Sequence, residues 1–177
     1  YVSEESGGNL GGNETGKKER ISFFKEFHGY CRSLAPDKPV MLAPNCWYVK
    51  EALDAWPELL KYIDILCPFA FHRMNPDDIT GEESAAILQK LCDDAGTHIW
   101  MDMELFLFDK TEALYPRPIE GLLSDLKRFP NFEKILGYQY QGLLCAPDAS
   151  ARLGEANAVR LFEDYKKYLG TARKTQA

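Results

Sequence analysis

The chain has 177 residues, of which 45% are hydrophobic, 12% aromatic and 27% charged. These values exclude disordered, collagen-like and coiled-coil chains. With 21 Lys and Arg against 27 Asp and Glu, the net charge is -6, so the chain has no general attraction to the phosphates of nucleic acid. No apolar run reaches the ~20 residues that span a bilayer. The length favours a single domain over 1–177 with a substantial core.

Short apolar runs alternate with longer amphipathic segments along the chain. We expect strands at residues 1–3, 39–43, 63–71, 98–106 and 134–141, and helices near 18–34, 49–62, 81–95, 118–129 and 155–169. Pro118 suits a first helical position, while Gly96 and Gly170 suit helix ends. No hairpin signal such as Asn-Gly joins any two strands. Strands separated by helices predict right-handed crossovers and a parallel sheet, which is an α/β fold.

The spacing of the expected strands indicates a barrel. They begin about 34 residues apart, close to the ~31 residues per unit of an eight-fold β/α (TIM) barrel of ~250 residues. We therefore predict the C-terminal five β/α units of a TIM barrel, strands 4 to 8, with the N-terminal units supplied by residues outside this sequence. The competing architecture is a five-stranded doubly wound sheet, which would be complete at this length.

Two carboxylates recur on one face of the strand expected over 98–106. Because successive side chains of a strand point to opposite faces, Trp100, Asp102 and Glu104 share a face, and the other face is apolar. The apolar face should pack against the helices, so Asp102 and Glu104 should point into the barrel near its mouth. There they could serve function, or they could form structural ion pairs with residues such as Arg73.

Three segments resemble one known family. The segments Tyr-Val-Ser-Glu-Glu at 1–5, Trp-Met-Asp-Met-Glu-Leu-Phe at 100–106 and Gly-Tyr-Gln-Tyr-Gln-Gly at 137–142 are similar to the last strands of a barrel family common in Bacteroides-type bacteria. That family is a domain of unknown function with a glycosidase-like TIM barrel. The resemblance covers nearly all of this chain but only the second part of the family's domain. It implies hydrolysis of a glycosidic bond without a cofactor, and export to the periplasm or beyond.

The layout is also similar to that of retaining glycosidases, which carry an acid/base on barrel strand 4 and a nucleophile on strand 7. The resemblance implies Glu5 or Glu4 as acid/base and Glu104 as nucleophile. Asp102 is the alternative to Glu104, and strand parity favours Glu5 over Glu4 as the inward residue. Retention requires two carboxyl groups ~5–5.5 Å apart across the sugar. Those glycosidases usually have Asn before the acid/base, whereas Ser3 or Glu4 stands there in this chain.

Aromatic and polar side chains at the other strand ends would contact the sugar. Aromatic faces stack on sugar rings and polar side chains bind hydroxyls, so the candidate substrate-binding residues are Asn45, Trp47, Phe71, His72, Trp100, Tyr138, Gln139, Tyr140 and Gln141. Tyr138 or Tyr140 could also donate a hydrogen bond that keeps Glu104 ionised.

Three other functions are weighed against the glycosidase. Residues 11–18 nearly match a phosphate-binding P-loop, but Lys18 replaces the required Ser or Thr and Glu14 would repel phosphate; the Gly-rich run 7–16 fits a mobile loop better. Asp102, Glu104 and His72 could gather a metal, although no local ligand motif supports it. The barrel could also bind glycans without cleaving them. The five scattered cysteines lack zinc-site spacing and are predicted to be mostly buried free thiols.

Overall fold

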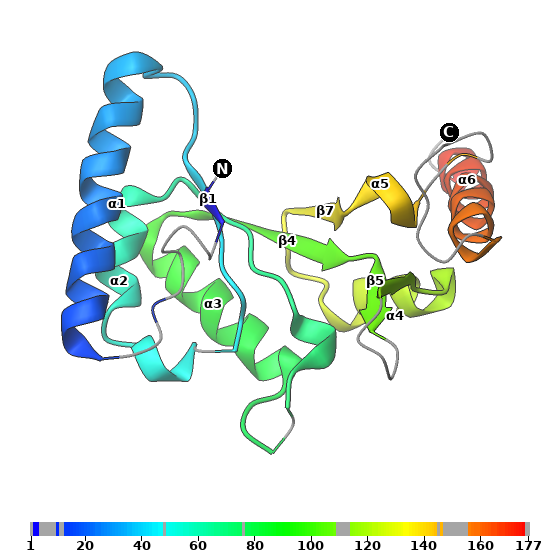
Figure 1. The fold of residues 1–177 in the computed structure, drawn as a ribbon, viewed down its shortest axis with the longest axis horizontal. Helices are drawn as coiled ribbons and strands as arrows, with labels where there is room; N and C mark the ends of the chain where they lie inside the picture. The colour runs from blue at the N-terminus through cyan, green and yellow to red at the C-terminus, as the bar shows by residue number, and fades with distance from the viewer. Residues whose placement is uncertain are drawn as a thin grey trace. The chain divides into compact units, whose positions relative to one another are not determined.

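The computed structural model describes residues 2–3, 10, 13–47, 49–75, 77–108, 114–144, 146 and 156–175. Strands, helices and short 3-10 turns (η) follow one another along the chain (Figure 1). In order they are β1 (Val2–Ser3), α1 (Glu14–Leu34), β2 (Met41–Ala43), η2 (Lys50–Ala52), α2 (Trp56–Leu59), η3 (Leu60–Tyr62), β3 (Ile65–Leu66), η4 (Phe71–Arg73), α3 (Gly81–Ala95), β4 (His98–Glu104), β5 (Phe106–Phe108), β6 (Leu114–Pro116), α4 (Ile119–Arg128), β7 (Lys134–Tyr138), α5 (Tyr140–Leu143) and α6 (Ala156–Thr175). Among the described residues, no helix has the length and apolar character needed to cross a bilayer.

In the part of the chain that the structure describes, five strands form one sheet in the order β1-β2-β3-β4-β7. The first four run parallel, with Leu42 of β2 opposite both Val2 and Leu66, and Leu66 opposite Ile99. The predicted parallel α/β fold is therefore confirmed. Strands of this sheet that follow one another along the chain are also neighbours in the sheet. Doubly wound sheets reverse their strand order at a switch point, so the observed order disfavours the competing architecture.

The chain forms two compact units. The first comprises Tyr1–Asp102 with Phe129–Leu136, and the second comprises Met103–Arg128 with Gly137–Ala177. The core of the first unit includes fully buried side chains such as Phe24, Trp56, Leu66 and Leu88. In the second unit a buried cluster is formed by Leu105, Phe106, Leu122, Leu143 and Leu161. The expectation of a single domain over 1–177 stays a prediction.

The helix predicted over 81–95 is confirmed because local signals define both of its ends. The Thr80 hydroxyl accepts a hydrogen bond from Glu83 N (3.2 Å), and the Glu83 carboxylate accepts one from Thr80 N (2.9 Å). This reciprocal arrangement is a capping box. At the other end, Gly96 adopts the left-handed conformation with φ +71° that stops the helix.

Other boundaries differ from the prediction. The helix expected over 49–62 is divided into η2, α2 and η3. Pro57, in the first turn of α2, lacks the amide that would let a helix continue through it. At the end of the sheet, β7 stops at Tyr138 rather than 141, and α5 begins at Tyr140. The last helix continues past Gly170 to Thr175, so Gly170 is not a helix end.

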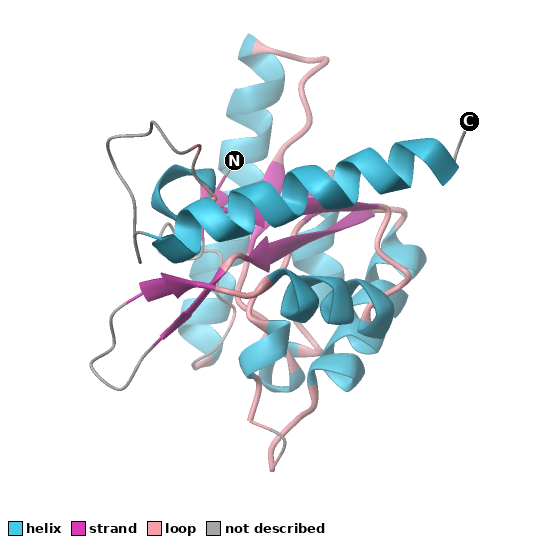
Figure 2. Cartoon of the chain, turned by 90° about the vertical axis from the view of Figure 1, so that its right-hand side faces the viewer, coloured by secondary structure: helices cyan, strands magenta, loops and turns pink. Residues whose placement is uncertain are grey.

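A β-hairpin was not predicted. Strands β5 and β6 pair antiparallel, with Phe106 opposite Pro116 and Phe108 opposite Leu114, and Figure 2 shows the two strands side by side. The connection between them is longer than the two-residue Asn-Gly type of turn that a sequence search detects most readily. The pairing returns the chain toward the end of β4, where Arg117 N donates to Leu105 O (2.9 Å).

We predict that Thr80→Ala lowers the free energy of unfolding by about 1 kcal/mol, because the capping hydrogen bond to Glu83 N is lost. Chemical denaturation followed by circular dichroism would measure the change. Thr80→Ser keeps a hydroxyl and should lie close to the wild type. Equal loss of stability in both variants would contradict the capping role.

Candidate functional site

The segments after β2 and β3 stay paired beyond the ends of these strands. Cys46 N donates to Phe69 O (3.2 Å), and Phe69 N donates to Pro44 O (3.1 Å). Asn45 and Phe69 form a parallel bridge at the same place. Open α/β sheets bind their ligands outside the carboxyl ends of the strands. The backbone thus holds two loops next to each other at the carboxyl ends of the strands, where a site is expected.

These two loops line a cavity of about 310 Å³ in the first unit. Its walls are formed by Trp47, Glu51, Arg73, Met74, Asn75, Asp78 and Ile79. The volume lies at the lower end of the ~300–1,000 Å³ typical of small-molecule sites. Trp47 leaves 41% of its surface exposed, so the cavity has an accessible aromatic wall.

Trp47 is held in place by two contacts. Its backbone N donates to Asn45 Oδ1 (3.1 Å), so these two predicted binding residues lie together. The Arg73 guanidinium carbon lies 5.1 Å from the centroid of the Trp47 ring, which is within cation–π range. The cavity therefore combines a restrained indole with an arginine side chain.

Sequence reasoning did not identify the polar walls of this cavity. Arg73 follows the predicted His72 at the end of the third expected strand. This position at a strand end could have marked Arg73 as a candidate site residue. The other polar walls are Glu51, Asn75 and Asp78. They belong to no recognisable motif, and only the folding of the two loops brings them to one cavity.

The loop after η4 is fixed by close packing against the start of α3. A Cβ atom at Gly81 would lie 2.4 Å from Phe71 O, so only glycine permits this approach. Phe71 is buried, and its ring lies 5.3 Å from the Phe129 ring and 5.5 Å from the Phe132 ring. Phe71 therefore packs in the core and is not an open sugar platform in this structure. His72, also in η4, is half-buried.

Burial alternates over residues 99–102 of β4 as the sequence predicted, but the alternation ends there, since Met103 is half-buried and Glu104 is buried. Ile99 and Met101 are buried, whereas Trp100 and Asp102 are half-buried. Lys134 Nζ lies 4.4 Å from the centroid of the Trp100 ring, so one face of the indole is covered by a cation. Trp100 is consequently a less accessible aromatic surface than Trp47.

Two cysteines near this strand are buried and have raised thiol pKa values. Burial, with the charge of Asp102 as a smaller cause, raises the pKa of the Cys67 thiol to about 12. Burial, with smaller effects of Asp93 and Glu133, likewise raises the pKa of Cys92 to about 12. The thiolate is the reactive form of cysteine, so neither residue is a candidate nucleophile.

In the second unit, Glu104 is the last residue of β4 and only 3% of its surface is exposed. Its carbonyl oxygen accepts a hydrogen bond from Arg117 Nη1 (3.2 Å). The next amide, Leu105 N, donates to Tyr138 O (2.6 Å) at the end of β7. Gln139 follows Tyr138 across a cis peptide bond and is half-buried. Glu104 thus lies beside the predicted Tyr138–Gln139 end of β7.

Several predicted site residues lie outside the described residues. These are Glu4 and Glu5, together with the side chains of Tyr140 and Gln141 in α5. Their proposed roles stay predictions. The backbone immediately before Glu4 is described, with Ser3 opposite Ala43 in the sheet.

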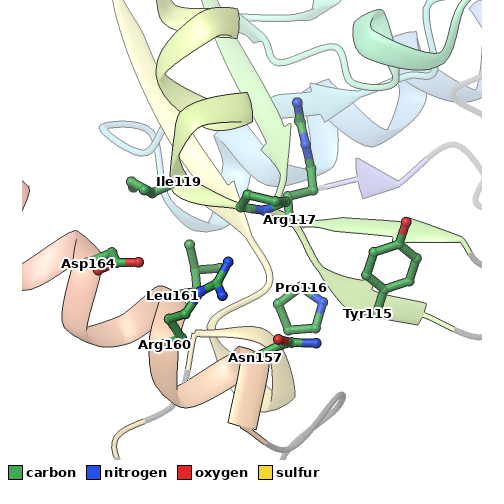
Figure 3. A pocket seen from close by; sticks show the side chains of 9 residues that line it. Tyr115, Pro116, Arg117, Ile119, Asn157, Arg160, Leu161 and Asp164 are labelled. Carbon is green, nitrogen blue, oxygen red and sulfur yellow. The ribbon is translucent and has the colours of Figure 1, made fainter.

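A smaller cavity of about 110 Å³ lies between β6, α4 and α6 (Figure 3). It is lined by Tyr115, Pro116, Arg117, Pro118, Ile119, Asn157, Arg160, Leu161 and Asp164. None of these is a predicted site residue. The side chain of Arg117 points away from Asn157 and Arg160 (Figure 3), and its guanidinium bonds to the end of β4 instead.

The described residues give no support to two alternative sites. Within them, no three His, Cys, Asp or Glu side chains are grouped so that they could hold a metal ion. Lys17 of the P-loop-like segment lies in α1. Its Nζ is 3.0 Å from Glu14 Oε1 and 3.3 Å from Asp54 Oδ1, so carboxylates already neutralise its charge.

Comparison with known proteins gives a family and a solved structure of similar fold. The family model described as "Domain of unknown function (DUF4434)" matches residues 1–151. No curated protein matches the chain. Among solved structures, a "putative alpha-L-fucosidase" from Bacteroides thetaiotaomicron is similar in fold, with a TM-score of 0.67 and 16% identity. The match covers 84% of this chain and 49% of the other, so this chain spans about half the length of that protein.

We predict that iodoacetamide at pH 8 leaves Cys67 and Cys92 unmodified in the native protein, because both thiols are buried with raised pKa values. Half-buried Cys31 should react faster. Peptide mapping by mass spectrometry before and after addition of denaturant would measure this. Rapid native labelling of Cys67 would show that the strand-end packing is wrong.

Proposed function

The chain belongs to the DUF4434 family, and on that premise we propose that it forms part of a β/α-barrel glycoside hydrolase in which Glu104 is a catalytic carboxylate. The fold similarity to a protein named as an alpha-L-fucosidase supports this class of architecture. The activity is the one that the resemblance of the sequence to retaining glycosidases implies, and the position of Glu104 supports it.

The observation that carries the proposal is the position of Glu104. It is a carboxylate with 3% of its surface exposed at the carboxyl end of a parallel strand. Burial of an ionisable group is energetically unfavourable even where partners reduce the cost. Because parallel α/β folds place their sites at the carboxyl ends of the strands, a carboxylate at this end of β4 favours a chemical role.

The strand order supports the pairing of Glu104 with a second acid. β1 and β4 stand three places apart in the sheet order, as do strands 4 and 7 of an eight-stranded barrel. In the proposed barrel the remaining units come from residues beyond this sequence. Glu5, with Glu4 as alternative, is then the acid/base and Glu104 the nucleophile.

The proposed reaction proceeds with retention of configuration. The Glu104 carboxylate attacks the anomeric carbon while the acid protonates the departing oxygen, and water then hydrolyses the glycosyl-enzyme. Asp102 stays the alternative nucleophile. Tyr138, whose carbonyl is bonded to Leu105 N, is the candidate donor of a hydrogen bond to the nucleophile.

The cavity beside Trp47 is the proposed sugar-binding region. An exposed indole suits the apolar face of a sugar ring, and the surrounding Arg73, Asn75 and Asp78 offer donors and acceptors for hydroxyls. Glu104 does not line this cavity. The cavity therefore also favours the second candidate function, a barrel that binds carbohydrate without cleaving it.

We predict that the natural full-length protein hydrolyses at least one member of a panel of aryl glycosides that includes an α-L-fucoside. Glu104→Gln should lower kcat at least ~10³-fold, because an amide can neither attack nor stabilise positive charge at the anomeric carbon. Initial-rate kinetics with the chromogenic substrates would measure this, and sugar binding by calorimetry should persist.

Glu120→Gln is the matched control, since Glu120 is an exposed carboxylate of α4 in the same unit. It should keep wild-type kinetics. Full activity in Glu104→Gln would refute the proposed role of this residue. Saturable sugar binding without turnover across the panel would establish the non-catalytic function, and loss of activity with a chelator would establish a metal-dependent enzyme.

We also predict that Trp47→Ala raises KM or the sugar dissociation constant ~10-fold or more, since the aromatic wall of the cavity is removed. Trp47→Phe retains an aromatic face and should lose less affinity. Unchanged affinity in Trp47→Ala would show that the sugar binds elsewhere.

A further inference from the structure

The peptide unit that joins Glu104 to Leu105 is fixed at both ends. Its carbonyl oxygen accepts from Arg117 Nη1 (3.2 Å), and its N–H donates to Tyr138 O (2.6 Å). A peptide plane held by both polar groups cannot rotate without breaking one of these bonds. The direction in which Glu104 leaves the backbone is therefore set by its neighbours.

Arg117 contributes a second bond to the same turn of chain. Its backbone N donates to Leu105 O (2.9 Å), so this one residue binds the carbonyl oxygens of both Glu104 and Leu105. Its side chain also reaches α4, where Nη2 donates to Gly121 O (3.3 Å). The Arg117 guanidinium thus links the end of β4 to the start of α4, and Arg117 itself directly follows β6.

The charge of this guanidinium is balanced inside the protein. Arg117 Nη1 lies 2.8 Å from Asp125 Oδ2, and the two side chains are 7% and 6% exposed. Asp125 Oδ1 is also 3.5 Å from Arg128 Nη1. A buried pair contributes little net stability relative to apolar residues, but removal of one partner leaves an uncompensated charge. Such a pair is better explained by the geometry that it imposes than by the stability that it adds.

We propose that Arg117 is a positioning residue for Glu104, with Asp125 as the partner that holds its guanidinium in place. The inference rests on the proposed function of Glu104. Lysine cannot replace Arg117, because a single ammonium group cannot donate to Glu104 O, Gly121 O and Asp125 together as the planar guanidinium does. Displacement of a reacting group by ~1 Å can cost about 10²-fold in rate.

The test is a comparison of Arg117→Lys and Asp125→Asn with the wild-type protein on its best aryl glycoside. Both variants should lower kcat ~10- to 100-fold with KM changed less than ~3-fold, since the sugar-binding cavity is not altered. Rates are normalised to the folded fraction measured by denaturation, so that loss of stability does not count as loss of catalysis.

Arg32→Lys is the matched structural control. Arg32 Nη2 lies 2.5 Å from Asp64 Oδ1, and its Nη1 donates to Pro36 O (2.8 Å) and Lys38 O (2.9 Å). Arg32 thus also binds one carboxylate and two backbone carbonyls, although its side chain is 33% exposed. These groups lie before β2 and β3, at the amino ends of the strands. Arg32→Lys should reduce stability and leave kcat unchanged.

The outcomes separate the two proposals. If Glu104→Gln is inactive while Arg117→Lys and Asp125→Asn keep wild-type kcat, the positioning role is overturned and the proposed function stands. If Glu104→Gln is fully active, the proposed function fails. If Arg32→Lys lowers kcat as much as Arg117→Lys, the effect is general destabilisation and the positioning role is again overturned. Absence of turnover in the wild-type protein overturns both.

Discussion

Main-chain hydrogen bonding between parallel neighbours is the constraint on which the rest of this structure depends. The ladder does not stop where the strands stop, since Cys46 N bonds to Phe69 O and Asp102 N bonds to Pro68 O (3.0 Å) beyond the regular pairing. Loops that begin from such bonded positions have little freedom in direction. The backbone hydrogen bonds hold the segments of Trp47 and Arg73 next to each other. The cation–π contact between the two side chains adds to this arrangement.

The same logic applies at Glu104, with a different source of rigidity. The hairpin returns Arg117 to the end of β4, where its buried guanidinium donates to the Glu104 carbonyl oxygen. The cost of burying this charge is offset by Asp125. Both candidate regions thus place a candidate side chain on backbone that is held by hydrogen bonds from neighbouring segments.

Features that are encoded locally were predictable from the sequence, and features that need tertiary contacts were not. The ends of α3 follow from Thr80, Glu83 and Gly96, and the alternation of burial over residues 99–102 of β4 follows from the pattern of apolar and polar residues. The β5–β6 hairpin lacked a short turn motif. Of the candidate site, Glu104 could be selected because it ends a strand and Trp47 because it lies in the loop after one. The pairing of Arg117 with Asp125 depends on how α4 packs and leaves no trace in the sequence.

The exposure of β7 has a practical consequence for work with this polypeptide. All five of its residues are exposed, and Ile135, Leu136 and Tyr138 present 36%, 37% and 49% of their surface. Among the described strands β7 closes the sheet order, and an outer strand with apolar side chains is a template for pairing with another chain. Purified material limited to these 177 residues should therefore self-associate as its concentration rises. Ile135→Lys would be the first change to make for solubility, since a charge on an outer strand discourages intermolecular sheet growth.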